Sequence, residues 1–525
     1  MIRRLRPAPP APRARSVAGR SLALLSSLLL AASCGGGRGP AGSGAESGPP
    51  PAAEYAFTEV TETAGVANAE HNHFGATWSD YDGDGRLDLY VVNDDTNTLY
   101  RNLGDGRFED VTAATGAGDP WFAMRNVWAD YDRDGDLDFY SHNFLQSTLY
   151  MQHRGVFYDV NAFSGAGLNM PNGTGAGWAD YDNDGWLDLH ACGFSGLGNN
   201  WNVLFHNNGD GTFTDLQPES GISYEGESMG QAWADYDNDG DLDLALAAVT
   251  MHYDHWLYRN NGDGTFTHVS VEAGITAAIE EGSSGAAVCW GDYDNDGWLD
   301  LVLTEVLLGS VKTEPERVYL FRNQGDGTFQ ELSVAAGIAP GPAIFDFWEA
   351  GFFDWDNDGD LDLFLGAEGP NLFYRNNGDG TFTDIAPELG LDFPEEGKGV
   401  VFGDYDDDGD LDLYLVQRLE EEPFVIPCRL FRNEGGSNHW LQVELQGTLS
   451  NLDAIGTRVL VRAGGRSQIR ELHAGRGLFS QDSPVLQFGL GPAATAASVT
   501  VRFPSGRILQ FHDVAADQRL LAVEP

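Results

Sequence analysis

The sequence predicts an all-β fold, a seven-bladed β-propeller followed by a small all-β domain, and three observations lead to it. One nine-residue acidic loop recurs seven times, at spacings of 50 to 62 residues. Four short runs of alternating apolar and polar residues accompany each copy, as strands do. After residue 436 the acidic loop is absent but the alternation continues, which indicates a second β domain.

The composition fits a folded repeat protein and excludes one that binds nucleic acid. The 525 residues are 42% hydrophobic and include 13 Trp and 29 Phe, which is ample for a core. Asp and Glu number 80 against 30 Lys and Arg, for a formal charge of −50. Residues 54–436 carry −57 of this, whereas residues 437–525 carry +1. Since phosphate backbones are bound by cationic surface, no nucleic-acid partner is expected.

The repeated loop has the pattern D-[YW]-D-x-D-G-x-L-D and first occurs at residues 80–88. Oxygens at positions 1, 3, 5 and 9 can converge on one ion, and position 7 can add its backbone carbonyl. Gly at position 6 permits the sharp turn, and Leu at position 8 anchors the loop to the core. Five or more oxygens suit calcium, whereas magnesium fits less well because it requires near-octahedral geometry.

Seven copies therefore predict about seven calcium ions as the cofactor. The alternative, solvated acidic hairpins, would place 33 Asp in seven short loops with no cation to offset their repulsion. The predicted metal ligands are the residues at positions 1, 3, 5, 7 and 9 of each loop: Asp80, Asp82, Asp84, Arg86, Asp88, Asp130, Asp132, Asp134, Asp136, Asp138, Asp180, Asp182, Asp184, Trp186, Asp188, Asp235, Asp237, Asp239, Asp241, Asp243, Asp292, Asp294, Asp296, Trp298, Asp300, Asp354, Asp356, Asp358, Asp360, Asp362, Asp404, Asp406, Asp408, Asp410 and Asp412.

Each loop lies between the first two strand signals of its unit, and a tight Asp-Gly turn joins the third to the fourth. These turns offer too few oxygens for an ion and are interpreted as hairpins. The seventh unit has no fourth strand signal before residue 436, but residues 57–60 match the fourth strands of the other units. We therefore predict that residues 57–60 pair antiparallel with residues 429–433 and close the ring.

Both parts of the chain resemble known families. Residues 177–189 (GWADYDNDGWLDL) and 257–267 (LYRNNGDGTFT) are similar to FG-GAP or VCBS repeats, which occur in integrin-type propellers and many bacterial surface proteins. The resemblance covers about 55–436 and implies a propeller. Residues 437–525 resemble the ASPIC/UnbV domain of the cartilage acidic protein-like family, through motifs such as DAIGTRV at 453–459 and VRFPSG at 501–506. No firm activity attaches to that domain.

The N-terminus predicts export. Six Arg precede an apolar run at residues 22–32 that is too short to span a bilayer, and Cys34 follows. Residues 1–33 are thus predicted to be a lipoprotein-type signal peptide, with lipidation at Cys34 and a flexible linker at residues 34–53. Ordinary signal-peptidase cleavage is the alternative, since Ala31 stands where lipoboxes usually have Leu. The expected location is the outer surface or the periplasmic face, with membrane contact through the lipid anchor only.

The remaining cysteines, Cys192, Cys289 and Cys428, are expected to be buried free thiols, in preference to a disulfide plus one unpaired thiol. No catalytic residue is predicted, because no nucleophile elbow, catalytic triad or phosphate-binding glycine loop is present. His439 and His473 of the tail are interpreted as surface or packing residues.

The leading functional hypothesis is a calcium-loaded surface module that binds or adheres to a protein or glycan. The alternatives are a secreted enzyme with its active site at the mouth of the propeller channel, and a purely structural surface-layer role. Side chains that precede the loops and differ between blades would line that mouth: His71, His73, Arg125, Asn172, Glu227, Glu349, Glu396 and Lys398.

Overall fold

The computed structural model describes residues 56–167, 173–193, 202–216, 219–222, 227–249, 255–276, 284–306, 317–338, 346–418 and 426–525. The predicted signal peptide 1–33, Cys34 and the linker up to residue 53 lie outside the described residues. The described chain is almost entirely β, as predicted. Its helices are single turns of four residues each: α1 (Thr61–Ala64), α2 (Thr112–Thr115), α3 (Asn161–Ser164) and α4 (Ala386–Leu389).

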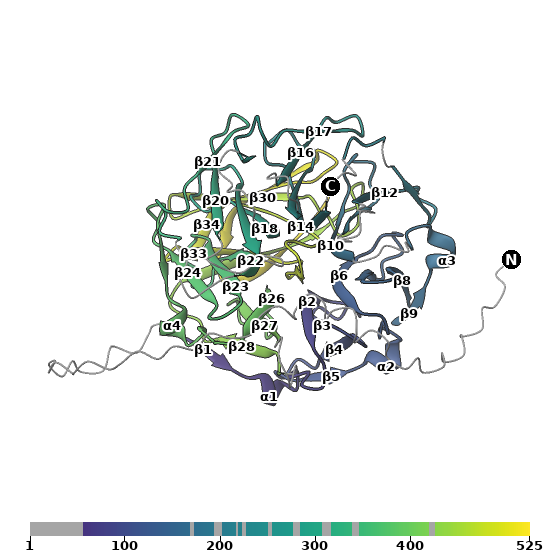
Figure 1. The fold of residues 1–525 in the computed structure, drawn as a ribbon. Helices are drawn as coiled ribbons and strands as arrows, with labels where there is room; N and C mark the ends of the chain where they lie inside the picture. Colours follow the sequence, from purple (N-terminus) through teal and green to yellow (C-terminus); the bar gives the residue numbers. More distant parts are fainter. Residues whose placement is uncertain are drawn as a thin grey trace, which may run out of the picture. The chain divides into compact units, whose positions relative to one another are not determined.

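Seven sheets of four blade strands stand around a common centre (Figure 1). The first, innermost strands of blades 1 to 7 are β2 (His73–Ser79), β6 (Ala123–Ala129), β10 (Gly173–Ala179), β14 (Glu227–Ala234), β18 (Ser284–Gly291), β22 (Phe347–Phe353) and β26 (Glu396–Gly403). The second strands are β3 (Asp88–Asn93), β7 (Asp138–Asn143), β11 (Asp188–Gly193), β15 (Asp243–Val249), β19 (Asp300–Val306), β23 (Asp362–Ala367) and β27 (Asp412–Arg418).

The third strands are β4 (Thr98–Asn102), β8 (Thr148–His153), β12 (Val203–Asn207), β16 (Trp256–Asn260), β20 (Val318–Asn323), β24 (Leu372–Asn376) and β28 (Arg429–Asn433). The outer strands are β5 (Phe108–Asp110), β9 (Val156–Asp159), β13 (Phe213–Asp215), β17 (Phe266–His268), β21 (Phe329–Glu331), β25 (Phe382–Asp384) and, for blade 7, β1 (Phe57–Glu59). Each first strand packs on the first strand of the next blade, and β26 packs on β2. The ring of seven blades is therefore complete.

The ring closes as predicted. Strand β1, from the start of the described chain, pairs antiparallel with β28, with Phe57 opposite Asn433 and Glu59 opposite Phe431. The chain thus supplies the last blade from both of its ends, and no blade is left without an outer strand.

Stacked aromatic rings hold neighbouring blades together. At three interfaces the Tyr at position 2 of one acidic loop stacks on the Trp of the next blade's first strand. The pairs are Tyr405 with Trp78, Tyr131 with Trp178 and Tyr236 with Trp290, with interplanar angles of 6°, 7° and 10°. Both members of each pair are buried. Aromatic pairs of this kind stabilise by about 0.5–1.5 kcal/mol beyond their burial. At these three interfaces, residues of the repeated motif itself make the contact between blades.

The tail is a separate pair of sheets. One has the order β33–β29–β36 and the other β31–β30–β34–β35. The predicted alternating segments correspond to β29 (His439–Gln446), β30 (Arg458–Ala463), β33 (Leu486–Gly491) and β34 (Thr495–Arg502), and the structure adds β31 (Arg466–Glu471), β35 (Ile508–Ala515) and β36 (Gln518–Val523). One further strand of the tail, β32 (Ser480–Gln481), joins blade 1 of the propeller instead.

The cysteine prediction is confirmed for the described residues. Cys192, Cys289 and Cys428 are all free and buried. Burial raises the pKa of the Cys192 and Cys289 thiols to about 12, so neither is a thiolate at neutral pH. They act as small core residues.

Candidate metal centres

Positions 1 to 8 of each acidic loop form the connection between the first and second strands of its blade, and the position 9 Asp is the first residue of the second strand. In all seven loops the N–H of the position 6 Gly donates to a carboxylate oxygen of the position 1 Asp over 2.8 to 3.1 Å, as Gly85 does to Asp80. These glycines have φ between 88° and 103°, a region that residues with side chains rarely adopt. The sharp turn expected at position 6 is confirmed.

Position 4, which the sequence pattern leaves unassigned, also has a positive φ in every loop. Asn tolerates this conformation, and its side chain links one loop to the next. Asn238 donates to the carbonyl of Gly297 over 3.3 Å, and Asn357 donates to that of Gly409 over 3.2 Å. The residues at this position are Gly83, Arg133, Asn183, Asn238, Asn295, Asn357 and Asp407. The recurrent Asn was the signal that sequence reasoning missed.

Three of the four predicted side-chain ligands lie close together in each of loops 1, 2 and 3. Carboxylate oxygens of positions 1, 3 and 9 lie within 4.8 Å of one another in loop 1 (Asp80, Asp82, Asp88) and in loop 2 (Asp130, Asp132, Asp138). In loop 3 the same holds for positions 1, 3 and 5 (Asp180, Asp182, Asp184). At position 7 the structure shows the N–H donating to the position 5 Asp in all seven loops. The ligand role of its carbonyl stays a prediction.

The residues fit a bound cation. Several loop carboxylate oxygens are buried and accept no hydrogen bond: Oδ2 of Asp138, and Oδ1 of Asp180, Asp235, Asp354 and Asp406. A buried, unpaired carboxylate oxygen costs several kcal/mol, and a cation in the loop would remove that cost. The donor set of hard carboxylate oxygens is the one that calcium prefers.

The pKa values of the loop aspartates also reflect the burial of several carboxylates close together. Burial, together with the neighbouring carboxylates, raises the pKa of Asp88 and of Asp180 to about 8. The same causes raise the pKa of Asp356 and of Asp410 to about 7. The protein alone therefore disfavours the ionised loops at neutral pH, and a divalent ion would offset their negative charge.

The position 9 Asp has a structural task as well. In every blade one of its oxygens accepts the N–H of the last or penultimate residue of the third strand, as Asp88 does from Asn102 over 2.7 Å. The side chain of that third-strand residue donates to the position 2 carbonyl of the preceding blade's loop, as Asn102 does to Tyr405 over 2.8 Å. Gln152 takes this role in blade 2. A closed circle of seven amide side chains thus joins loop to loop.

The tail domain covers the loop face. Gly489 N–H and the Gln442 amide donate to position 1 aspartates of loops 6 and 7, Asp354 and Asp404, over 3.0 and 2.6 Å. Asp453 accepts the N–H of Asp130 over 2.7 Å. Basic side chains of the tail reach further loop residues: Arg458 contacts Asp235 and Asn238, Arg466 contacts Asp360, Arg502 contacts Asp239, and Arg519 contacts Gly85 and Asp407. The weakly basic tail is seated on the acidic loops.

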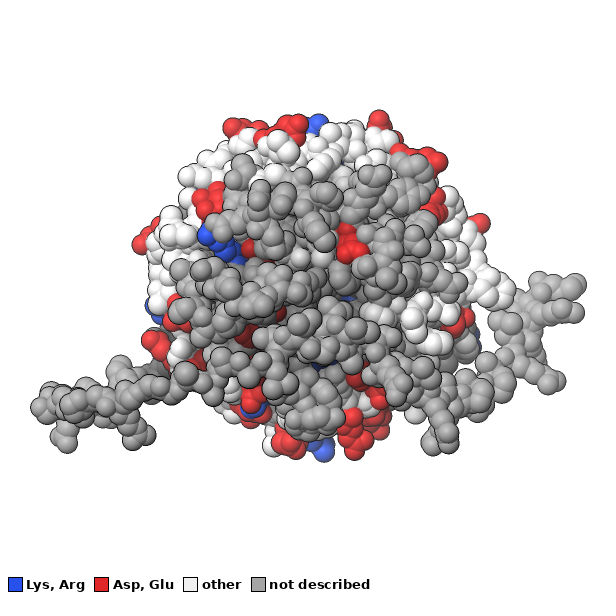
Figure 2. Space-filling model, in the orientation of Figure 1, with Lys and Arg blue, Asp and Glu red and all other residues white. Residues whose placement is uncertain are grey.

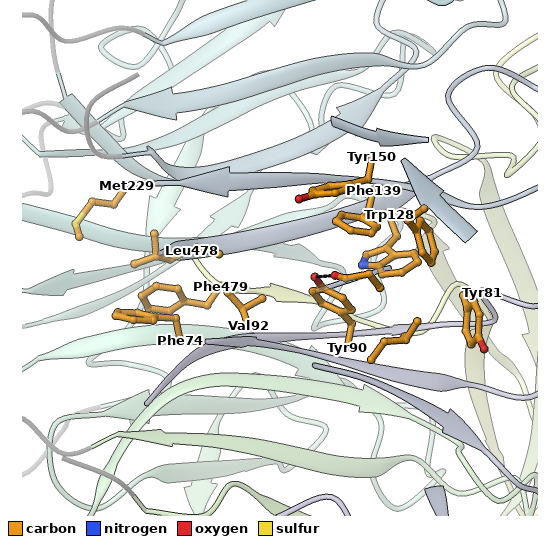
Figure 3. Packing of buried hydrophobic residues seen from close by; sticks show 14 of the residues in the cluster. Phe74, Tyr81, Tyr90, Val92, Trp128, Phe139, Tyr150, Met229, Leu478 and Phe479 are labelled. Carbon is orange, nitrogen blue, oxygen red and sulfur yellow. Dashed lines mark hydrogen bonds between the residues drawn. The ribbon is translucent and has the colours of Figure 1, made fainter. Parts of the chain in front are cut away.

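The channel is occupied by the tail. Residues 474–482, which we call the central segment, hydrogen-bond to the first strand of every blade. Contacts with β2, β6, β10 and β14 run through Ser480, Gln481, Ala474 and Gly477, and those with β18, β22 and β26 run through Gly477, Arg476, Phe479, Ser480 and Asp482. Figure 3 shows Leu478 and Phe479 beside Phe74 and Met229 in one buried cluster.

Two of the predicted channel-mouth residues bind this segment. Arg125 donates to the carbonyls of Gly477 and Ser480 over 2.8 and 2.9 Å. Glu349 accepts the N–H of Phe479 over 2.9 Å and lies 3.4 Å from Arg476, which in turn pairs with Asp482. Arg125 and Glu349 are fully buried. They hold the tail in place, so the structure assigns them a structural role.

The other candidates that the structure describes do not converge on one pocket. His73 is buried and bonds Asn93 over 3.0 Å, His71 lies 2.7 Å from Asp95, and the Lys398 ammonium lies 3.2 Å from the centre of the Trp348 ring. Glu227 begins β14, while Asn172 and the Glu396 side chain lie outside the described set. In the tail, His439 pairs with Asp517 over 2.8 Å, and His473 lines a cavity of about 140 Å³ between blades 5 to 7 and the tail.

Comparison with known proteins gives two family matches. The FG-GAP-like repeat model matches residues 80–141, 180–246, 235–303, 303–365 and 354–415. The model described as ASPIC and UnbV matches residues 447–525. Within the described residues no helix is long and apolar enough to cross a membrane.

Curated relatives match part of the chain. Cartilage acidic protein 1 of Homo sapiens is 26% identical over 49% of this chain and 38% of its own length, and that of Mus musculus is 27% identical over 50% and 40%. The chain thus spans about two fifths of the length of these relatives. Integrin alpha-E of Homo sapiens is 27% identical over 29% of this chain and 14% of its own length.

A solved structure with a similar arrangement is the Dos1 propeller, with a TM-score of 0.38 and 9% identity over 70% of this chain and 93% of that one. The repeat matches cover more than half of the sequence, and they fall on the blades and loops described above. The chain therefore belongs to the FG-GAP repeat proteins, as a seven-bladed propeller with a C-terminal ASPIC and UnbV domain.

Proposed function

We propose that this protein is an exported, calcium-loaded propeller that binds a protein or glycan partner at the cell surface. One contrast carries the proposal. The connections between first and second strands are eight residues long in every blade, whereas those between second and third strands, at the opposite ends of the strands, range from 4 to 11 residues. Connections that vary on an unvarying frame are where recognition is usually built.

In this proposal calcium has a structural role and does not contact the partner. The carboxylates at positions 1, 3, 5 and 9 would hold it, as far as each loop brings them together, and the bound ion would supply the positive charge that their buried oxygens lack. Support comes from the unpaired oxygens of Asp138, Asp180 and Asp354. Because the tail covers the loop face, the ions would stiffen the ring without meeting the partner.

The partner would bind at the face with the variable connections. Figure 2 shows one face of the molecule, on which the described Asp and Glu gather along the rim and Lys and Arg are few. An acidic rim of this kind favours a partner with cationic or neutral hydroxyl groups over a polyanion. The named relatives, an acidic protein of cartilage and an integrin subunit, support a binding or adhesion role.

The enzyme alternative has weaker support. An active site in the channel needs space among the first strands, and the central segment occupies that space on the described part of the ring. His473 and Glu471, which line the cavity beside the tail, are 3.9 Å apart. Burial lowers the pKa of His473 to about 4, which makes it a poor base at neutral pH.

Export through the predicted signal peptide and lipidation of Cys34 complete the proposal. An extracellular location would supply calcium at the concentration that such loops require, roughly 10⁻³ M. Two or three acyl chains give stable anchoring where one does not.

The test is capture of membrane and surface extract by the full mature protein, in millimolar calcium and in excess chelator. The proposal is supported by a partner that the protein retains only in calcium. Adding that partner in purified form should prevent its capture from the extract. The matched control is a variant in which the 11-residue connection 307–317 is replaced by a four-residue turn while all seven loops stay intact. If this variant and the parent capture the same partner equally, and every other shortened connection does so too, the variable face is not the binding surface.

A further inference from the structure

One loop has an imidazole where the others have an arginine or a methionine. The third-strand residue that faces the loop aspartates is Arg in five blades (Arg101, Arg259, Arg322, Arg375 and Arg432), Met151 in blade 2 and His206 in blade 3. The guanidinium of Arg322 bonds to Asp294 and Asp296 of its own loop. Arg101 and Arg432 bond instead to Glu109 and Glu434 outside the loops. Loop 3 therefore has no guanidinium from its own third strand, but a potential nitrogen ligand.

His206 lies among the ligands of loop 3. Its Nδ1 is 3.1 Å from Oδ1 of Asp188 and 3.5 Å from Oδ2 of Asp182. These three residues can present one ligand atom each within 4.8 Å of one another, and so can Asp180, Asp182 and Asp184. Ligands at about 2.0–2.1 Å from a tetrahedral ion are roughly 3.3 Å apart, which matches these separations.

A second observation points to an ion in this loop. Asp180 is buried, with 1% of its surface exposed, and its Oδ1 has no hydrogen-bond partner. Its other oxygen accepts the N–H of Gly185 over 3.1 Å, which fixes the carboxylate in place. Asp180 forms a group with Asp182 and Asp184, and this group shares Asp182 with the one that contains His206. His206 and Asp182 each keep 26% of their side-chain surface exposed, so an ion can enter from solvent.

We propose that loop 3 binds a first-row transition ion of the zinc class, through Asp180, Asp182, Asp188 and His206, while the other loops take calcium. An imidazole also lies near loop 2, where His153 groups with Asp134 and Asp136, but no member of that group is buried. Imidazole nitrogen is a common ligand of zinc, cobalt and nickel and is rarely one of calcium, which takes oxygen ligands almost exclusively. Three carboxylates and one imidazole give four protein ligands, the number typical of a closed zinc site. The proposal rests on the proposed metal loading of the loops and changes the identity of one ion.

The competing explanation is that His206 only replaces the charge of the arginine. His206→Arg separates the two explanations, because it restores the residue found in five blades and removes the nitrogen ligand. His206→Ala removes both the charge and the ligand. Arg259→Ala is the matched control, since it removes the equivalent side chain of blade 4 and leaves loop 3 intact.

The experiment is elemental analysis of the mature protein after stripping, then dialysis against millimolar calcium with micromolar zinc. We expect about one zinc and about six calcium ions per chain, loss of the zinc in both His206 variants, and its retention in Arg259→Ala. Cobalt in place of zinc should give the absorption bands of a four-coordinate site, and these bands should vanish with His206→Arg. Thermal melts confirm that each variant is folded.

Three outcomes overturn the inference. If both His206 variants retain the zinc, the zinc is bound outside loop 3. If calcium displaces the zinc, loop 3 is an ordinary calcium loop. If the protein holds seven calcium ions and no zinc, His206 contributes only its positive charge. Zinc without any calcium would support the site in loop 3 and refute the calcium proposal, so the two failures can be told apart.

Discussion

The two ends of the blade strands differ in what the sequence repeats. At one end every connection has eight residues, the same hydrogen bond from Gly to Asp, and in most blades a contact with the tail. At the other end the connections between second and third strands have 4, 4, 9, 6, 11, 4 and 10 residues. The repeated end builds and stiffens the ring, and the end that does not repeat is where specificity can reside.

The largest effect on stability should come from removing metal from the acidic loops. If all seven loops bind calcium, excess chelator should lower Tm strongly, and Tm should climb as calcium is raised through roughly 10⁻⁴ to 10⁻³ M. Scanning calorimetry at fixed calcium concentrations measures this. An unchanged Tm in chelated protein that holds no metal would show that the loops are solvated hairpins.

The metal-free protein should lose stability as pH rises. Burial raises the folded-state pKa values of Asp130 and Asp292 to about 7 and that of Asp88 to about 8, whereas the unfolded values are about 4. The folded state therefore binds more protons between these values, and the free energy of unfolding falls from pH 4 to pH 8. Urea melts in chelator across this range should show the decline, and melts in saturating calcium should show much less of it.

Breaking the central segment should come next. Glu349→Ala leaves Arg476 and Arg125 buried with one carboxylate fewer, which should cost about 3–5 kcal/mol of unfolding free energy. Arg462→Ala, at an exposed position of β30, is the control and should stay within about 0.5 kcal/mol. Equal denaturant midpoints for Glu349→Ala and the parent would mean that the segment contributes little to the ring.

A single loop should have a smaller effect. Asp356→Ala should remove about one calcium and about 1.5 kcal/mol at millimolar calcium. Asp237→Ala should do the same in blade 4. Asp263→Ala, in a hairpin turn where the carboxylate only accepts bonds from Thr265, should leave the metal count unchanged. Elemental analysis of the three variants measures the number of bound calcium ions. Loss of an ion from Asp263→Ala would show that the hairpin turns also supply ligands.

The smallest effect on stability should come from Cys34→Ser, because the sequence predicts a flexible linker between Cys34 and the propeller. The lipoprotein hypothesis predicts that this variant keeps the parent Tm but loses processing or membrane association. Membrane fractionation and mass spectrometry of the mature N-terminus measure both. Unchanged processing and partitioning would support ordinary signal-peptidase cleavage instead.

The repeat made most of the fold predictable. The pattern of residues 80–88 occurs seven times and so predicts seven blades. A fourth-strand motif at residues 57–60, before the first blade, predicts closure with β28. The convergence of aspartates was predictable too, because each loop contains its own ligands. The role of Asn102 and its equivalents was readable in principle from the Asn that recurs at the end of the third strand in every blade except the second, which has Gln152.

The route of the tail was not predictable. Residues 474–482 show no repeat and only one short strand, and their partners in the propeller lie 76 to 404 positions away along the chain. Arg125 and Glu349 differ between blades because they bind one asymmetric segment, and not because they bind a substrate. A sequence pattern identifies what recurs, whereas this contact occurs once.

Closure from both ends has a consequence for folding order. The last blade needs residues 57–59 and 429–433 together, and the first strands meet the central segment only after residue 482 has been made. The contact order is accordingly high, and most of the entropic cost of bringing distant residues together arises late in folding. Such a chain stays incompletely folded through nearly all of its synthesis, a state that suits passage across a membrane before folding. Refolding followed by Trp fluorescence should accordingly be slow and cooperative.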